Sequence, residues 1–254
     1  MRKISIKYIS KGDGPAILCL HGLGLDYNSF LPQINYLSDE YKVIAWKMPS
    51  FETGEIKEIS FKNLASAGFE LLDSLNIKNC HIIGHSMGGM IAIEMALLKK
   101  HRVKSLCLLG ATSAFGGKDD TFKNSFLQSR LKPLSEGRSM SDIAKLNVPL
   151  MFSKNARQTY IDASIKAMAE TSENNYRLAL ECLTTFDKRK EISLIEQPCC
   201  LIAASLDQAA PSKTIKKMSA NIKRSIFHLI EDCGHMMQLD KVDQVNHILR
   251  TFIK

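Results

Sequence analysis

The sequence predicts an α/β protein in which a mostly parallel central sheet is flanked by helices. Short apolar runs typical of buried strands alternate with helical patterns along most of the chain. The chain has 254 residues, of which 45% are hydrophobic and 24% are charged, and this is enough to bury the core of one domain. The alternation stops between residues 114 and 190, where the patterns are helical only.

The strands are predicted from apolar runs bounded by polar or glycine-containing segments. Residues 3–9 alternate apolar and polar side chains, which is typical of an edge strand and unlike a signal peptide. The other runs are apolar almost throughout, as expected for strands that are buried on both faces. They lie at 16–20, 41–46, 79–84, 103–110, 197–204 and 224–230.

The helices are predicted from the spacing of apolar residues. Residues 61–75 place their apolar side chains on one face, and residues 90–98 are apolar nearly all round, which indicates a buried helix. We interpret residues 114–190 as a helical lid inserted into an α/β core made of residues 1–113 and 191–254. Its scattered Phe and Met side chains are expected mainly in the lid's own core, although such a lid must also present apolar surface to a ligand.

The most informative motif lies between a predicted strand and a predicted helix. Residues 84–89 have the sequence Gly-His-Ser-Met-Gly-Gly, a G-x-S-x-G pattern. A serine on such a tight strand-to-helix turn exposes its hydroxyl above the sheet. The free N–H of Met87, at the start of the helix, is placed to stabilise a developing oxyanion. The motif predicts that Ser86 is a nucleophile; the alternative is a surface serine on a glycine-rich turn.

A serine nucleophile requires a base, and the base requires an acid that orients it. His235 ends a loop after the last predicted strand, and Asp207 follows the strand at 197–204. Ligand sites of open α/β sheets lie beyond such strand ends. The order serine, acid, histidine is also that of one class of serine hydrolases. We therefore predict His235 as the base and Asp207 as the acid that orients it.

Other side chains compete for these roles. The alternative acids are Asp187, Asp232 and Asp240. Asp232 is only three residues before His235, but the acid must approach the imidazole from the side opposite the serine, which favours Asp207. His85 is adjacent to Ser86, and we expect it to be structural because its side chain should point away from the nucleophile.

A glycine-containing loop follows the predicted strand at 16–20. Residues 21–24 have the sequence His-Gly-Leu-Gly, which allows close approach of the backbone to the nucleophile. We predict that the Leu23 N–H is a second oxyanion donor beside that of Met87. His21 is expected to support the loop by hydrogen bonding.

Together these motifs resemble those of serine hydrolases with the α/β-hydrolase fold, over nearly the whole chain. A finer similarity, to small carboxylesterases and 3-oxoadipate enol-lactonases, is carried by residues 176–183 and 186–187. The resemblance implies a carboxylic ester hydrolase that cleaves a small ester, thioester or lactone through an acyl-enzyme, without a cofactor. At 47–52 the chain has Lys-Met-Pro-Ser-Phe-Glu where the family often has Asp-x-Pro-Gly-x-Gly, so the substrate preference does not follow from the resemblance.

Two other functions remain open. A carbon–carbon bond hydrolase of ring-cleavage products would use the same three residues. The resemblance implies that such an enzyme has a lid cation for a substrate carboxylate, and Arg130 or Arg157 could serve. A ligand receptor on the same scaffold would bind its ligand with negligible turnover.

Bulk properties favour a small-molecule substrate and a cytoplasmic location. The seven cysteines, several of them inside predicted strands, are typical of buried thiols in a reducing compartment. No apolar run reaches the ~18 residues that span a bilayer, and no Cys or His spacing suggests a metal site. The net charge of +8 comes from dispersed lysines rather than a basic cluster interleaved with aromatics, so no nucleic-acid partner is expected. The basic composition slightly favours a monomer, and a homodimer with an interface through the lid is the alternative.

Overall fold

The structure, a computed structural model, describes residues 6–50, 58–116 and 119–253. Seven strands in these ranges form one sheet in the order β1-β3-β2-β4-β5-β6-β7. β1 (Tyr8–Lys11) pairs antiparallel with β3 (Lys42–Trp46), and all other pairings are parallel. The predicted fold class, a mostly parallel sheet flanked by helices, is confirmed.

The other strands lie where the sequence predicts them. They are β2 (Ala16–Leu20), β4 (Cys80–His85), β5 (Val103–Leu109), β6 (Cys199–Ala204) and β7 (Ser225–Ile230). Of the strand predicted at 3–9, the structure describes residues 6–9; here the strand β1 begins at Tyr8 and continues beyond the predicted end to Lys11. Its length is set by pairing with β3, whose last residue, Trp46, lies opposite Tyr8. Residues 1–5 lie outside the described part of the chain.

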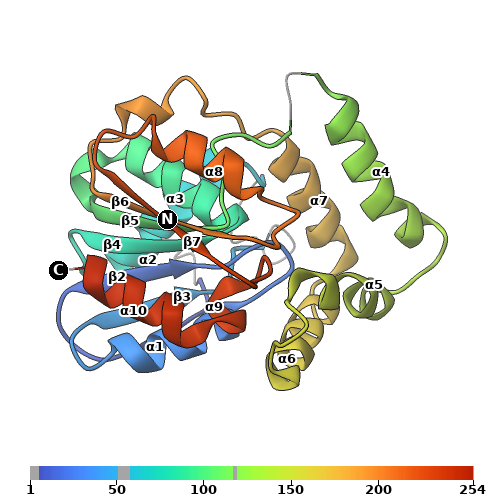
Figure 1. The fold of residues 1–254 in the computed structure, drawn as a ribbon, viewed down its shortest axis with the longest axis horizontal. Helices are drawn as coiled ribbons and strands as arrows, with labels where there is room; N and C mark the ends of the chain where they lie inside the picture. The colour runs from blue at the N-terminus through green and yellow to red at the C-terminus, as the bar shows by residue number, and fades with distance from the viewer. Residues whose placement is uncertain (1–5, 51–57, 117–118, 254) are drawn as a thin grey trace.

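Helices cover both faces of the sheet (Figure 1). One face packs against α2 (Phe61–Ser74), α3 (Met87–Leu98) and α8 (Ser212–Ser219). The opposite face packs against α1 (Leu31–Leu37) and α10 (Val242–Phe252). Successive side chains of each strand point to opposite faces, so that both faces are apolar. The helix α3 is apolar nearly all round because it packs against both the sheet and α2.

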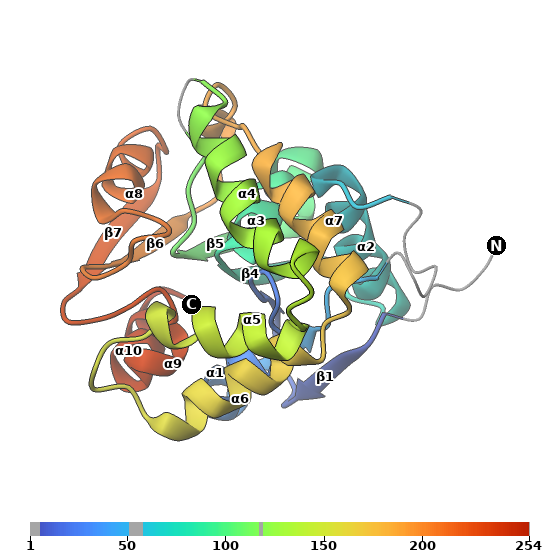
Figure 2. The ribbon, with the colours of Figure 1, turned by 90° about the vertical axis from the view of Figure 1, so that its right-hand side faces the viewer.

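Four helices lie beyond one end of the sheet, at the right of Figure 1 and facing the viewer in Figure 2. They are α4 (Thr121–Ser135), α5 (Met140–Asn147), α6 (Gln158–Ala169) and α7 (Glu173–Thr184). The two ends of this segment meet, because the Phe115 N–H donates to the Phe186 carbonyl over 2.8 Å. That residues 114–190 act as a lid stays a prediction.

The remaining short helices connect these elements. They are α9 (Met237–Asp240) and the 3₁₀ turns Tyr27–Phe30, Lys100–Arg102, Pro149–Met151 and Ile192–Leu194. The α4–α7 segment has its own apolar cluster, which includes Ile143, Met168 and Leu180 and packs onto Leu25 and Leu239 of the core. Within the described ranges, no helix has the length and apolar composition that a bilayer crossing requires.

Candidate active site

Ser86 lies on a strained turn between β4 and α3. Its φ of 54° and ψ of −120° are unusual for a residue with a side chain, and its N–H donates to the Leu109 carbonyl over 2.9 Å. The turn depends on glycine, because a Cβ on Gly88 would overlap the Leu20 carbonyl oxygen and one on Gly84 would crowd the Gly88 carbonyl. The turn leaves Ser86 half-buried at the wall of a cavity.

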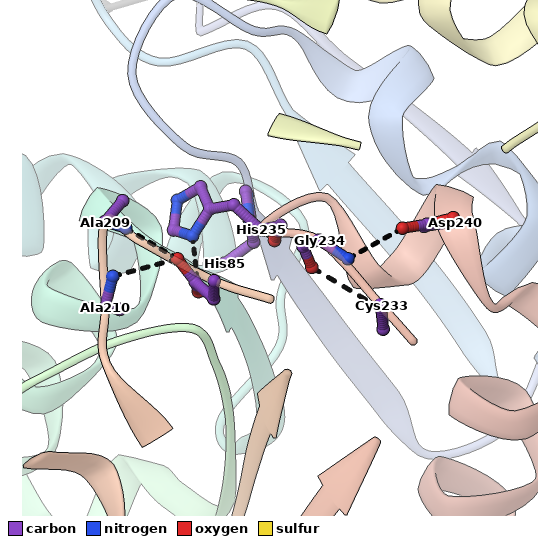
Figure 3. Close-up of polar contacts among 8 residues, drawn as sticks. His85, Ala209, Ala210, Cys233, Gly234, His235 and Asp240 are labelled. Carbon is purple, nitrogen blue, oxygen red and sulfur yellow. Dashed lines mark hydrogen bonds and ion pairs between the residues drawn. The ribbon is translucent and has the colours of Figure 1, made fainter. Parts of the chain in front are cut away.

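Asp207 and His235 meet at the ends of two neighbouring strands. Asp207 follows β6 and His235 follows β7, and Asp207 Oδ2 lies 2.7 Å from His235 Nδ1. The other carboxylate oxygen of Asp207 accepts the N–H groups of Ala209, over 2.8 Å, and Ala210, over 2.9 Å (Figure 3). The carboxylate is therefore held on both sides, with one oxygen directed at the imidazole.

The surroundings of Asp207 favour its ionised form. Burial raises the pKa of this carboxyl, but the hydrogen bond and charge of His235 and the two backbone N–H groups outweigh burial. The pKa of Asp207 consequently lies below its ordinary value. An ionised Asp207 accepts a hydrogen bond from His235 Nδ1–H and leaves Nε2 free to take up a proton.

The alternative acids have other partners. Asp187 forms an ion pair with Arg189. Asp240 accepts the N–H of Gly234 over 2.8 Å, and it also accepts the N–H and hydroxyl of Ser153. Asp232 is exposed, and its N–H donates to the Ser205 hydroxyl. The described geometry therefore brings Asp207, and none of these three carboxylates, to the His235 ring.

Ser86 and His235 line the same cavity, whose volume is about 580 Å³. This is within the range of small-molecule sites. No hydrogen bond joins the two side chains in the described part of the protein, and in ligand-free enzymes such bonds are often long until substrate binds. Several wall side chains are apolar, including Leu23, Leu25, Met90, Phe115, Phe126, Met168, Leu180 and Leu183.

The predicted oxyanion donors come from two segments near the nucleophile, the start of α3 and the loop after β2. Met87 is the first residue of α3, so its N–H has no acceptor one turn earlier. Leu23 lines the cavity, and outside the regular elements no backbone acceptor for its N–H is found among the described residues. A Cβ on Gly22 would lie 3.2 Å from Ser86 Cβ, which shows how closely this loop approaches the serine. The role of both N–H groups stays a prediction.

His21 supports its loop by hydrogen bonding, as expected. Its Nδ1 donates to the Gly22 carbonyl over 2.8 Å, and its Nε2 accepts the Met48 N–H over 2.9 Å. Burial lowers the pKa of His21 to about 4. Protonation would turn the Nε2 acceptor into a donor facing another donor, so the loop requires neutral His21.

Acid should therefore destabilise the fold through His21. Between pH 6.5 and about 4 the unfolded chain binds a proton that folded His21 does not, so the free energy of unfolding falls as the pH falls through this range. The shift corresponds to about 3 kcal/mol. The measurement is urea unfolding of the wild type and of His21→Gln at the two ends of this pH range. The free energy of unfolding should fall less between the two pH values in His21→Gln, which still contains His81 and His85, than in the wild type. Equal losses in the variant and the wild type would contradict the prediction.

His85 contacts the candidate base in a way that the sequence does not reveal. Its Nε2–H donates to the backbone carbonyl of His235 over 2.9 Å (Figure 3). The centroids of the His85 and His235 rings are 4.8 Å apart. Burial and the neighbouring His235 lower the pKa of His85 to about 3, so the ring is neutral. The structural role expected for His85 thus includes holding the main chain of His235.

The Phe and Met side chains of residues 114–190 divide between the segment's own core and the cavity wall. Met140 and Phe152 are buried in the segment's own core, as predicted. Apolar side chains between residues 114 and 190 also line the cavity, namely Phe115, Phe122, Phe126, Met151 and Met168, of which Met168 belongs to the segment's core as well. The core helices α3 and α8 contribute Met90 and Thr214 to the same wall. In the 47–52 loop, the structure describes residues 47–50 only.

Comparisons with known proteins agree with this architecture. The family model of the alpha/beta hydrolase fold matches residues 15–242. The chain is 23% identical over 257 residues to 3-oxoadipate enol-lactonase 1 of Acinetobacter baylyi, with 100% of this chain and 94% of the relative covered. It is 26% identical over 251 residues to a pimeloyl-(acyl-carrier protein) methyl ester esterase of Legionella pneumophila, with 96% and 97% covered.

Solved structures show the same fold. An enol-lactonase from Burkholderia xenovorans LB400 superposes with a TM-score of 0.87 at 19% identity, and 98% of this chain and 96% of that chain are covered. An esterase from Exiguobacterium antarcticum gives a TM-score of 0.86 at 21% identity, with 97% and 94% covered. Because the family model spans most of the sequence and the architecture is the same, the chain belongs to the alpha/beta hydrolase fold family.

Proposed function

We propose that the protein hydrolyses a small carboxylic ester, thioester or lactone, with Ser86 as nucleophile, His235 as base and Asp207 as the acid that orients it. The observation that carries the proposal is the 2.7 Å contact between Asp207 and His235 beside a cavity that also contains Ser86. Relatives named as an enol-lactonase and a methyl ester esterase support acyl chemistry of this kind.

The first half of the reaction forms an acyl-enzyme. His235 Nε2 removes the hydroxyl proton of Ser86 as Oγ attacks the carbonyl carbon of the substrate. The N–H groups of Leu23 and Met87 stabilise the resulting oxyanion, and each such donor is worth about 3 kcal/mol in related enzymes. The imidazolium, stabilised by ionised Asp207, then gives its proton to the leaving alcohol or thiol as the carbon–oxygen or carbon–sulfur bond breaks.

The second half releases the acid. Water gives a proton to His235 Nε2 and attacks the acyl carbon, and the tetrahedral oxyanion again lies against Leu23 and Met87. Collapse of this intermediate returns the proton to Ser86 Oγ and frees the carboxylic acid. For a lactone, the alcohol and the acid remain in one product molecule.

A variant of His85 tests how the main chain of the base is held. His85→Phe removes the donor to the His235 carbonyl, and we expect kcat to fall by about five- to tenfold, the value of one ordinary hydrogen bond, with KM unchanged. His85→Gln retains a donor and should lose less. The measurement is kcat and KM for both variants, with the thermal midpoint as a check on folding. A loss of kcat that is equal in the two variants would contradict this positioning role.

The proposed function itself is tested by initial rates on p-nitrophenyl esters of increasing acyl length. Wild-type turnover that depends on acyl length supports the proposal, and the preferred length measures the acyl portion of the cavity. A fluorophosphonate probe should label Ser86 in parallel. If Ser86 is labelled but no ester, thioester or lactone is hydrolysed, the proposal is wrong, and the carbon–carbon hydrolase and receptor alternatives gain support.

A further inference from the structure

Arg130, on α4, is the one strongly charged side chain in the wall of the Ser86 cavity. Of the described residues that line this cavity, none other is Asp, Glu, Lys or Arg. Asp207 lies behind the wall, with its side chain fully buried. The cavity therefore combines a candidate nucleophile, a mainly apolar surface and a single fixed cation.

The guanidinium of Arg130 is held in place by uncharged groups. It lies over the Phe126 ring, with 5.6 Å between the central carbon and the ring centroid, and one of its nitrogens donates to Asn147 Oδ1. Asn147 is oriented in turn, because its amide nitrogen donates to the Ile143 carbonyl over 2.9 Å. No ion pair of Arg130 is found in the described ranges.

This arrangement leaves the Arg130 cation without a charged partner among the described residues. The side chain is half-buried, so neutral groups and the cavity wall replace part of its contact with water. Arginine has five N–H donors in a planar fork, and Asn147 uses only one of them. Tyr176 also lines the cavity. Burial raises the pKa of its phenol, and the positive charge of Arg130 lowers this pKa by a smaller amount, so the electrostatic effect of Arg130 extends to the cavity wall. The remaining donors match the two oxygens of a carboxylate.

We propose that Arg130 is an anion subsite, so that the substrate has a carboxylate in addition to the ester, thioester or lactone that is cleaved. This inference rests on the proposed function. Arg130 binds the carboxylate through paired N–H donors, and Asn147 and Phe126 hold the guanidinium in the binding orientation. The apolar wall between Arg130 and Ser86 receives the chain that joins the two functional groups of the substrate.

The test compares pairs of substrates that differ at one end. Mono-p-nitrophenyl esters of straight-chain dicarboxylic acids are compared with p-nitrophenyl esters of monocarboxylic acids of equal carbon number, and the rate with Ser86→Ala is subtracted. At the chain length that spans the two groups, we expect wild-type kcat/KM to favour the carboxylate by roughly ten- to 100-fold. In Arg130→Gln this preference should disappear, while hydrolysis of the neutral esters continues.

Arg157→Gln is the matched control. Arg157 also lies over an aromatic ring, that of Tyr160, but it is exposed and does not line the cavity. It should retain the full preference for carboxylates. A wild type without this preference at any chain length, or the same preference in Arg130→Gln as in the wild type, would overturn the proposal.

A binding measurement separates this proposal from the proposed function. Calorimetric titration of Ser86→Ala, which needs no turnover, compares monomethyl esters of dicarboxylic acids with neutral methyl esters. Tighter binding of the carboxylates that is lost in Ser86→Ala/Arg130→Gln supports the subsite even if the wild type hydrolyses no ester. Equal affinities for the two series would refute the subsite, whether or not the ester hydrolase proposal holds.

Discussion

Ser86→Ala is expected to lower kcat for ester hydrolysis by roughly 10,000-fold or more, because the reaction then lacks the atom that forms the acyl-enzyme. The residual rate would come from oxyanion stabilisation and substrate binding alone. The change removes a single oxygen from a half-buried side chain whose structural contacts are made by its backbone. We therefore expect the variant to fold normally and to bind substrate with little change.

The measurement is steady-state kinetics on the preferred ester, together with fluorophosphonate labelling and a thermal midpoint. Ser125→Ala is a suitable control, because Ser125 is an exposed serine on α4 outside the cavity wall. It should retain wild-type kinetics and labelling. Retention of more than a few per cent of turnover by Ser86→Ala would mean that another group is the nucleophile.

Asp207→Asn is expected to lower kcat by about 10,000-fold while leaving the nucleophile in place. The structure gives the reason, since Asp207 Oδ1 accepts two backbone N–H groups and Oδ2 faces His235 Nδ1. In the variant the amide oxygen would remain with the backbone donors, and the NH₂ group would turn toward the imidazole. His235 would then adopt the tautomer that has its proton on Nε2, which cannot take the Ser86 proton.

The variant is compared with Asp187→Asn, which alters an acid paired with Arg189. Asp187→Asn should retain kcat within a fewfold of the wild type. Slow fluorophosphonate labelling of Ser86 in Asp207→Asn, with unchanged substrate affinity, would match the loss of an activated serine. If kcat falls equally in both variants, the effect belongs to the fold rather than to the orientation of His235.

Much of the fold could be predicted because local patterns determine it. Apolar runs bounded by polar segments located the strands β2 to β7. The inner strands, such as β2, β4 and β6, are buried on both faces and have few other compositions, and the edge strand β7 was located by its apolar run even though Ile226 and Leu229 are exposed. The turn at Ser86 was visible because Gly84 and Gly88 each lie two residues from the serine, and a Cβ at Gly88 would overlap the Leu20 carbonyl. The end of β1, at Lys11 instead of residue 9, was missed, because the extent of a strand depends on its neighbour β3 as well as on its own alternation.

Some features of the candidate site could be predicted from the sequence, and others depend on the tertiary structure. By itself the sequence determined the sheet, the strand-to-helix turn at Ser86 and the order of Ser86, Asp207 and His235, because spacing along the chain and the absence of a Cβ act locally. Only the tertiary structure decided which carboxylate meets His235, how His85 holds its main chain, and that Arg130 faces the cavity. These relations join segments far apart in sequence, and side-chain packing between such segments leaves no periodic pattern in either one.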